Sequence, residues 1–193
     1  MLSQLWPALR INIFLTILLG IGYPLAITGI SQLVFPHQAN GSLITKNGQV
    51  IGSELIGQNF TKPEYFQPRP SAAGNDGYDA TASGGSNYGP TNQKLIDRVK
   101  ASVDKFHKDN PDYHGPIPAD LVTASGSGLD PDISPASAMA QEPRVANARG
   151  ISADQLNQLV AQHTKSPDLG LLGEPRVNVL ELNLALDQQY PKK

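Results

Sequence analysis

The stretch from Ile11 to Phe35 limits most strictly what this chain can fold into. It reads INIFLTILLGIGYPLAITGISQLVF, and the chain carries no Asp, Glu, Lys or Arg from Ile11 until Lys46. A helix of that length, at 1.5 Å per residue, extends about 37 Å, whereas the hydrocarbon of a bilayer is roughly 30 Å thick. The chain beyond this region is polar. The sequence therefore predicts one transmembrane helix that carries one soluble domain.

A cleaved signal peptide is the competing interpretation of the same stretch. Its apolar core would be about 7–15 residues long and end at a small-residue cleavage site. The run here is longer, and its best cleavage candidate is Gly29-Ile30-Ser31. We therefore expect a retained span, with 1–10 as a short cytoplasmic N-terminus, 11–35 as the transmembrane helix and 37–193 as an extracytoplasmic domain. The orientation follows from Arg10, which precedes the span, by the positive-inside rule.

The predicted span has two unlike sides. When it is wound as a regular α-helix at about 100° per residue, small and polar residues gather on one arc: Asn12, Thr16, Gly20, Gly22, Tyr23, Ala26 and Gly29. Small residues let helices approach closely, and Asn or Thr can hydrogen-bond across such a contact. Glycine is also common in helices that only tether a domain, and Pro24 can kink the helix. We expect this arc to face a partner in the membrane.

Composition excludes several classes of protein. The chain has 193 residues, a formal charge of −2 and no cysteine. Without cysteine there is no disulfide, no cysteine metal site and no lipid-bearing N-terminal Cys. No cluster of Lys or Arg supplies the basic surface that nucleic acid requires, so we expect no nucleic-acid partner. The part after the span has the size of a single domain.

Local patterns predict an α+β fold for that domain, with a small sheet, three or four helices and long ordered loops. Asn47-Gly48 favours a tight turn between strands at 43–45 and 49–51. Residues 53–90 have many turn formers and five aromatic residues, which indicates an ordered loop assembly rather than a disordered linker. A further short strand is expected at 121–123.

Helices are predicted from their capping signals. The first begins at Thr91 or Asn92 and ends at Asn110-Pro111. The second begins at Ser134-Pro135 and is limited by Pro143. The third carries a capping box of Ser152 and Gln155, and the fourth begins at Asn178 after a possible strand at 176–179.

No catalytic or metal-binding arrangement emerges from the residues alone. The four histidines, His37, His107, His114 and His163, lack metal-ligand spacing. The segments Ser83–Ser86 and Ser125–Gly128 are rich in Gly and Ser, and their backbone N–H groups suit an anion. This leaves open an anchored binding module for a small anion or sugar. A hydrolase using Ser125 or Ser127 lacks a base and an orienting acid.

Motifs along the whole chain nevertheless resemble one known family. They are Gly57-Gln58-Asn59-Phe60, Tyr65-Phe66, Arg69-Pro70-Ser71-Ala72-Ala73-Gly74, Tyr78-Asp79-Ala80, Ser83-Gly84-Gly85-Ser86-Asn87, Gly89-Pro90-Thr91-Asn92, Asp120-Leu121-Val122-Thr123, Ser125-Gly126-Ser127-Gly128-Leu129-Asp130-Pro131, Arg144-Val145-Ala146, Ala148-Arg149 and Arg176-Val177-Asn178-Val179-Leu180. Together and in this order they resemble the KdpC family, a subunit of the bacterial potassium-transporting Kdp ATPase. The segment from Phe106 to Pro116 carries no such motif.

The resemblance implies a non-catalytic, single-pass subunit of an inner-membrane complex for high-affinity potassium uptake. Its implied partners are a potassium-channel-like subunit, a P-type ATPase subunit and a small hydrophobic subunit, together with the lipid bilayer. The family is described as assembling or stabilising the complex, and as a catalytic chaperone that raises the affinity of the ATPase subunit for ATP. The resemblance implies no cofactor of the chain's own, because ATP and K⁺ are handled by the complex. It also implies the orientation that Arg10 indicates.

Two expectations concern the loops. The family-motif residues expected to serve docking are Arg69, Ser71, Tyr78, Asp79, Asn87, Ser125, Ser127, Asp130, Arg144 and Arg149. Among them, the arginines suit forked hydrogen bonds to carbonyls or carboxylates that hold loops in place. The acidic loop residues Asp76, Asp79, Asp130 and Asp132 motivate a hypothesis that the domain shapes the approach of K⁺ to the channel subunit.

Overall fold

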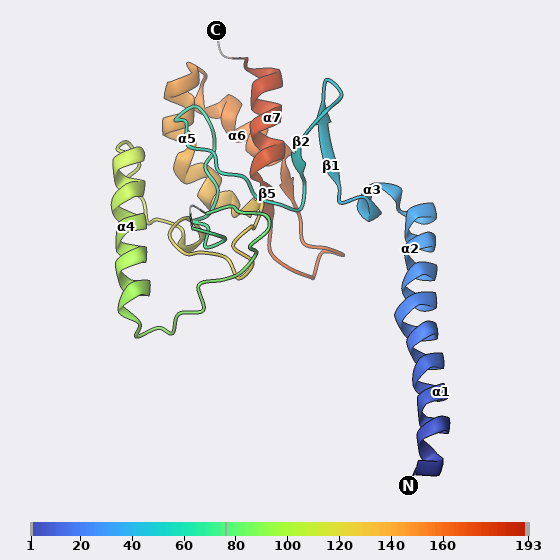
Figure 1. The fold of residues 1–193 in the computed structure, drawn as a ribbon. Helices are drawn as coiled ribbons and strands as arrows, with labels where there is room; N and C mark the ends of the chain where they lie inside the picture. Colours follow the sequence, from blue (N-terminus) through green and yellow to red (C-terminus); the bar gives the residue numbers. More distant parts are fainter. Residues whose placement is uncertain (1, 76, 192–193) are drawn as a thin grey trace. The chain divides into compact units, whose positions relative to one another are not determined.

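A computed structural model describes residues 2–75 and 77–191 and contains two units, Met1–Ile51 and Gly52–Lys193 (Figure 1). The first unit holds α1 (Leu5–Leu15), α2 (Tyr23–Val34), α3 (Pro36–Ala39) and most of the hairpin β1 (Leu43–Lys46) and β2 (Gln49–Ser53). The second holds α4 (Gln93–Asp109), β3 (Asp132–Ile133), α5 (Pro135–Arg149), α6 (Ala153–Gln162), β4 (Thr164–Lys165), β5 (Arg176–Asn178) and α7 (Val179–Gln189). Single-turn 3₁₀ segments lie at Leu2–Gln4 and Ala119–Leu121.

The span is one continuous helix from Leu5 to Val34, 30 residues long, with a mean hydropathy of 2.0 over its most apolar 18 residues and no buried residue. It begins six residues before the predicted start, because apolar residues and a proline tolerated in the first turn precede Ile11. Arg10 lies inside the helix with its guanidinium 4.8 Å from the Trp6 ring centroid. Length and composition therefore agree with a membrane-spanning segment.

The middle of this helix is wider than an α-helix. Between Thr16 and Gly22 the turns are π-helical, and the Tyr23 N–H donates to the Leu18 carbonyl, five residues back. Pro24 supplies a reason: it has no N–H, and in a regular α-helix its ring would collide with the carbonyl of Gly20. Turns closed five residues back move that carbonyl away from the ring.

The wide turns divide the predicted arc of small and polar residues. About one extra residue per turn rotates everything after Gly22 by roughly 100° relative to an ideal helix. Asn12 and Thr16 then form one polar pair, joined by a 3.4 Å hydrogen bond between their side chains. Gly22, Ala26 and Gly29 still share a face, because they are spaced by four and three residues, but it is no longer the face of Asn12.

The hairpin is as predicted. Asn47 and Gly48 have φ values of 53° and 78°, the left-handed conformations that a two-residue turn between antiparallel strands requires.

The second unit is built on a three-stranded antiparallel sheet in the order β3-β5-β4. Ile133 and Thr164 both lie opposite Val177, so the middle strand is β5. Helices α5, α6 and α7 gather beside this sheet, whereas α4 lies on the other side of the domain (Figure 1). The main core consists of Phe66, Ile133, Ala138, Val145, Ala146, Leu156, Leu159, Val160, Val177, Val179, Leu182, Ala185 and Leu186. A smaller cluster of Phe106, Leu121 and Ala140 attaches the end of α4.

The predicted helix starts are confirmed. The side chains of Asn92, Ser134 and Asn178 accept hydrogen bonds from the first turns of α4, α5 and α7. Ser152 and Gln155 form the complete capping box of α6. The α+β class is therefore confirmed, with four α-helices among the described residues of the soluble unit.

Two local predictions are wrong. Residues 121–123 form no strand. Leu121 instead ends a 3₁₀ turn, and its side chain packs in the smaller core cluster with Phe106 of α4. Pro143 does not limit α5, which continues to Arg149 and ends at Gly150 with a left-handed φ of 66°. Val145 and Ala146 beyond the proline are buried in the main core, and this packing outweighs one lost hydrogen bond. Met139, whose carbonyl loses that bond, lies on the exposed side of α5.

Replacing Leu182 with Ala should destabilise the full chain by about 2–5 kcal/mol, because the Leu182 side chain is fully buried and leaves a cavity. Urea unfolding in detergent, followed by circular dichroism, measures the loss. Leu171→Ala is the matched control: Leu171 is 86% exposed, so its loss should stay below about 0.5 kcal/mol. Equal losses for the two variants would contradict the assigned core.

Candidate functional site

Most of the family motifs meet in one place, where residues 57–90 lie against residues 123–131. We call these two segments the loop layer. Gly57 N–H donates to Leu129 O (2.9 Å), and Gly84 N–H donates to Ser127 O (2.8 Å). The Ser71 hydroxyl donates to Gly128 O (2.5 Å). The two segments thus satisfy each other's backbone groups without forming a sheet.

Glycine allows the segments to come this close. A Cβ added to Gly57 would lie 2.5 Å from the carbonyl oxygen of Asp130, and one added to Gly128 would lie 2.7 Å from the carbonyl oxygen of Gly84. Gly128 also has a left-handed φ of 69°. Any side chain at these positions would force the backbones apart.

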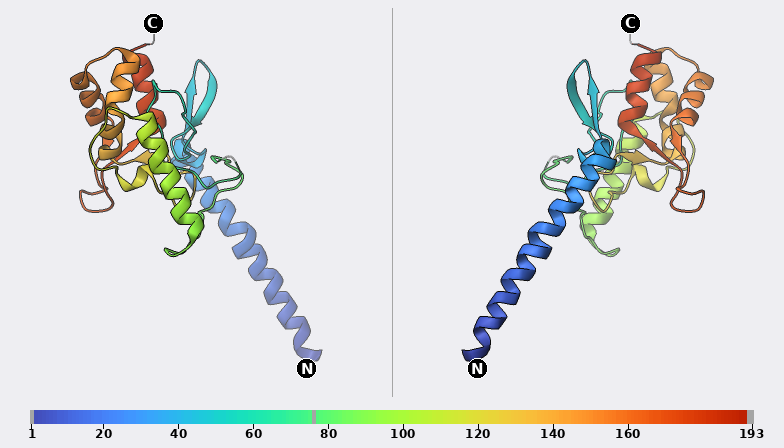
Figure 2. Two further views of the ribbon diagram at one scale, coloured as in Figure 1. Left: turned by 90° about the vertical axis from the view of Figure 1, so that its left-hand side faces the viewer. Right: turned by 90° about the vertical axis from the view of Figure 1, so that its right-hand side faces the viewer.

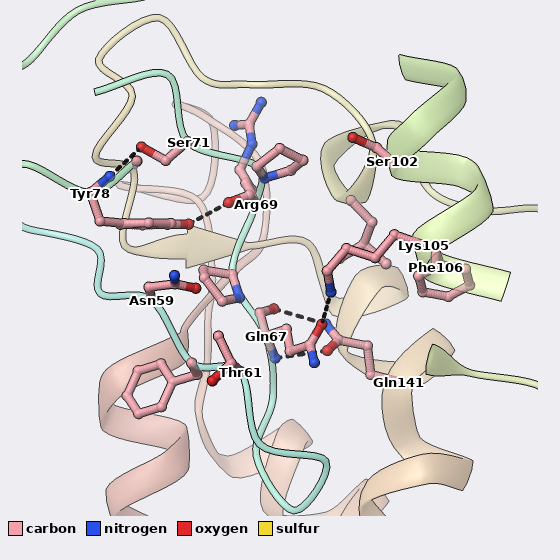
Figure 3. A pocket seen from close by; sticks show the side chains of 15 residues that line it. Asn59, Thr61, Gln67, Arg69, Ser71, Tyr78, Ser102, Lys105, Phe106 and Gln141 are labelled. Carbon is pink, nitrogen blue, oxygen red and sulfur yellow. Dashed lines mark hydrogen bonds between the residues drawn. The ribbon is translucent and has the colours of Figure 1, made fainter. Parts of the chain in front are cut away.

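A polar knot around Tyr78 fixes the centre of the loop layer (Figure 3). Tyr78 has a left-handed φ of 60°, unusual for a bulky residue. Its N–H donates to Ser71 Oγ (2.8 Å), and its hydroxyl donates to the Arg69 carbonyl. Arg69 in turn pairs with Asp130 (2.7 Å). Burial, and then the charge of Asp130, raise the pKa of Tyr78, so the phenol stays protonated at neutral pH.

Two arginines of α5 hold the preceding loop, as the sequence predicts for such residues. The buried Arg144 donates to the carbonyls of Pro63 (2.6 Å) and Tyr65 (2.9 Å), and to the side chains of Asn110 (2.9 Å) and Gln141 (2.7 Å). Burial lowers the pKa of Arg144 to about 10, which leaves it charged at neutral pH.

Arg149 does the same one turn further on. Its side chain, 1% exposed, pairs with Asp187 of α7 (2.7 Å) and donates to the carbonyls of Glu64 (3.0 Å) and Tyr190 (3.0 Å). Its guanidinium also lies 4.8 Å from the Tyr65 ring centroid. The loop is therefore joined to both α5 and α7.

A pocket of about 270 Å³ opens between the loop layer and α4 (Figure 3). Its polar lining has two cationic residues, Arg69 and Lys105, and is otherwise neutral: Asn59, Thr61, Gln67, Ser71, Tyr78, Ser102 and Gln141. Gln67 and Gln141 bond to each other, because the Gln67 N–H donates to Gln141 Oε1 (2.7 Å) and Gln141 Nε2 donates to Gln67 O (3.0 Å). No His, Cys or carboxylate lies among the described lining residues. Among these lining residues, the hydroxyls of Ser71 and Ser102 therefore have no His or carboxylate that could act as their general base.

The acidic loop residues are already engaged within the domain. Asp130 pairs with Arg69, and Asp132 pairs with Arg176 (3.2 Å). Burial, and then the charge of Asp130, raise the pKa of Asp132. Hydrogen bonds from Thr81 lower the pKa of the exposed Asp79. Asp76 lies outside the described residues. Within the part of the chain that the structure describes, no group of three or more His, Cys, Asp or Glu could hold a metal ion.

The two Gly-Ser segments lie against each other, which uses several of the N–H groups an anion would need. Gly84 N–H donates to Ser127 O, Gly128 N–H to Ser125 Oγ (2.9 Å) and Leu129 N–H to Ser127 Oγ (3.1 Å). Ser125 and Ser127 contact each other through their hydroxyls (3.3 Å). Asn87 is exposed and has a left-handed φ of 51°. These residues shape turns, and their docking role stays a prediction.

Sequence reasoning missed the buried amides that align the loop with the helices. Asn183 of α7 is 2% exposed. Its side-chain amide accepts from the Phe66 N–H (2.9 Å) and donates to the Phe66 carbonyl (2.9 Å), so it pairs both backbone groups of Phe66 as a neighbouring strand would. Asn178 donates to Glu54 O (2.9 Å) in addition to capping α7. Asn183 lies four residues before Asp187, within an otherwise leucine-rich helix, and that polar interruption was the available signal.

Comparison with known proteins agrees with the motifs. A family model described as K+-transporting ATPase, c chain, matches residues 5–188. The chain is 62% identical over 187 residues to the potassium-transporting ATPase KdpC subunit of Gemmatimonas aurantiaca, covering 97% of this chain and 94% of the relative. This chain belongs to the KdpC family. Two further KdpC subunits, from Rhodospirillum rubrum and Caulobacter vibrioides, are 56% and 57% identical over 99% of this chain and 98% and 96% of their own lengths.

Membership in the KdpC family covers the span and the loop layer alike. The matched range begins at Leu5, where the transmembrane helix begins, and ends inside α7. The one apolar helix, together with the match to a K+-transporting ATPase subunit, is consistent with a single-pass membrane protein.

The raised pKa of the buried Tyr78 makes the free energy of unfolding of this KdpC chain fall at alkaline pH. The phenol titrates at about pH 10 when unfolded, and its folded pKa is raised. Its stabilising contribution is therefore complete below pH 10 and is lost as the pH rises above it, because the unfolded state releases the proton first. Free energies of unfolding measured between pH 9 and 11.5 should fall less steeply in Tyr78→Phe than in the natural chain. The exposed Tyr88→Phe should keep the natural slope, and a Tyr78→Phe slope equal to it would refute the assignment.

Proposed function

We propose that this chain is a non-catalytic accessory subunit of an ATP-driven, high-affinity potassium uptake complex. It assembles or stabilises a channel-like subunit and a P-type ATPase subunit, with a small hydrophobic subunit beside them. Family membership over residues 5–188 is the observation that carries the proposal. The side chains of the family motifs support it, since they bond to loop backbones and to one another rather than forming a reactive cluster. ATP hydrolysis and K⁺ conduction then belong to other subunits, and the chain needs no cofactor of its own.

The proposed location is the bacterial inner membrane. The helix Leu5–Val34 crosses it once, with the N-terminus in the cytoplasm and the bulk domain outside. Arg10 supports this orientation, because the only basic side chain within the described helix lies near its N-terminal end. The span has no buried residue of its own, so its polar and small faces are available to neighbouring helices in the bilayer.

The finer proposal is that the subunit acts as a catalytic chaperone and raises the affinity of the ATPase subunit for ATP. An external domain cannot touch cytoplasmic nucleotide in the orientation proposed. Its influence then takes the form of a coupling free energy transmitted through partner helices. The rigid loop layer suits this role, because a domain held by buried arginines can stabilise one arrangement of its partners against another.

The span test concerns Gly22 and Ala26, which share a face after the wide turns. Replacing both with Leu should sharply reduce copurification of the chain with the other subunits, because bulky side chains keep a neighbouring helix at a distance. The control exchanges Ile21→Leu and Leu25→Ile, which keeps both volume and apolar character. Affinity purification from detergent-solubilised membranes measures the yield. Full recovery of the Leu variant would mean that assembly depends on the external domain alone.

The chaperone test compares ATP binding by the ATPase subunit in complexes with and without this chain. A coupling free energy of about 1–3 kcal/mol corresponds to about 5–150-fold tighter ATP binding. Titration with a fluorescent ATP analogue reads the affinity directly, independent of turnover. Identical affinities in the two preparations would remove the chaperone role and leave the assembly role standing.

A further inference from the structure

The connection between β4 and β5 forms a small hairpin of its own, residues 166–175, which we call the leucine tip. Asp168 and Leu172 exchange two backbone hydrogen bonds of 2.9 Å, and Gly170 N–H donates to Pro167 O (2.9 Å). The tip extends outward from the body of its domain in each view (Figures 1 and 2). It is therefore a turn closed by its own hydrogen bonds that projects away from the sheet.

This turn displays large apolar side chains to solvent. Leu169 is 90% exposed, Leu171 86% and Leu172 62%. Within the described part of the soluble unit, the other exposed large apolar residues are each less exposed than Leu171, and most are scattered: Leu55, Ile56, Tyr88, Ile96 and Met139. Three leucines concentrated on one protruding turn form the kind of apolar patch that marks an interaction site.

The backbone of the tip aims these side chains outward at a cost. Leu169 has a left-handed φ of 55°, which is unfavourable for a residue with a branched side chain. It precedes Gly170, with φ of 73°, so two successive left-handed residues turn the chain. Such strained positions concentrate at sites of contact and function.

The charges around the tip favour a protein over a bilayer as its partner. Asp168 and Glu174 flank the leucines, and an anionic lipid surface repels carboxylates. The nearest basic residues are already paired, Lys165 with Glu181 (3.0 Å) and Arg176 with Asp132 (3.2 Å). The tip contains no Trp, Tyr, Lys or Arg, the residues that anchor peptides at a membrane interface.

We propose that the leucine tip inserts into an apolar socket, rimmed by basic side chains, on a partner subunit of the transport complex. The inference deepens the proposed function, on which it rests, by naming the contact surface of the external domain and the chemistry of its partner. The convex apolar tip supplies the anchor residues, and Asp168 and Glu174 supply the complementary charge at the rim.

The test uses the full chain in the intact complex and places the photoreactive amino acid benzoylphenylalanine at Leu171. The matched control places it at Met139, which is 54% exposed on α5. Irradiation should cross-link position 171, and not position 139, to a partner subunit. In addition, Leu169→Ser, Leu171→Ser and Leu172→Ser together should weaken retention in the complex about tenfold or more. Circular dichroism should show the melting temperature of the isolated chain little changed.

Charge reversal separates the possible occupants. Asp168→Lys with Glu174→Lys should weaken retention in the complex, because the rim then repels the socket. Three outcomes would each overturn the inference while leaving the accessory function in place. The tip of the natural chain could bind phosphatidylglycerol vesicles more strongly than it binds the partner subunits. Position 171 could cross-link to lipid or to a second copy of the chain, or it could form no cross-link in an intact complex. If the unmodified chain assembles with no partner at all, the proposed function fails first and the inference falls with it.

Discussion

Buried arginines on one helix hold the soluble domain together where regular secondary structure does not. Arg144 and Arg149 of α5 gather the carbonyls of Pro63, Glu64 and Tyr65 from a loop that belongs to no sheet. A buried carbonyl without a donor is costly, so the hydrogen bond from Arg149 to the carbonyl of the buried Glu64 stabilises the loop where it enters the domain. The same guanidinium groups bond to Gln141 of α5 and Asp187 of α7, which attaches the loop to both helices.

The loop layer extends this arrangement, with Arg69 paired to Asp130 as the cation at its centre. The Ser71 hydroxyl accepts from the Tyr78 N–H and donates to the Gly128 carbonyl. Glycine at position 128 lets the backbones of the two segments come into contact. One consequence is that few motif side chains remain available for chemistry. Arg69 forms an ion pair with Asp130, and the two Gly-Ser segments are hydrogen-bonded to each other. A domain organised in this way is suited to presenting a fixed shape, which is what the proposed accessory role requires.

Sequence reasoning succeeded where the signal is local. Ser152 with Gln155, and Asn47 with Gly48, form their capping box and turn within four residues, so the pattern determines the structure. It failed at Pro143, where burial of residues further along α5 overrides a local preference. It also missed every pairing over long distances, such as Asn183 with Phe66, 117 residues apart. The span was recognised from hydropathy, but the π-helical turns before Pro24 were not, because a constant 100° step assumes a regular helix.

The same contrast bears on how a family of this kind is recognised. Its motif residues Arg69, Tyr78 and Arg144 turn inward and determine the shape of the domain, so similarity in these motifs reports a shared fold before it reports a shared contact. The leucines between β4 and β5 belong to no motif, yet they include the two most exposed large apolar residues in the described part of the domain, Leu169 and Leu171. Burial and exposure, rather than motif membership, therefore distinguish residues that build this subunit from residues free to meet another. If the subunit is non-catalytic, as proposed, that distinction is the most direct route from structure to partner.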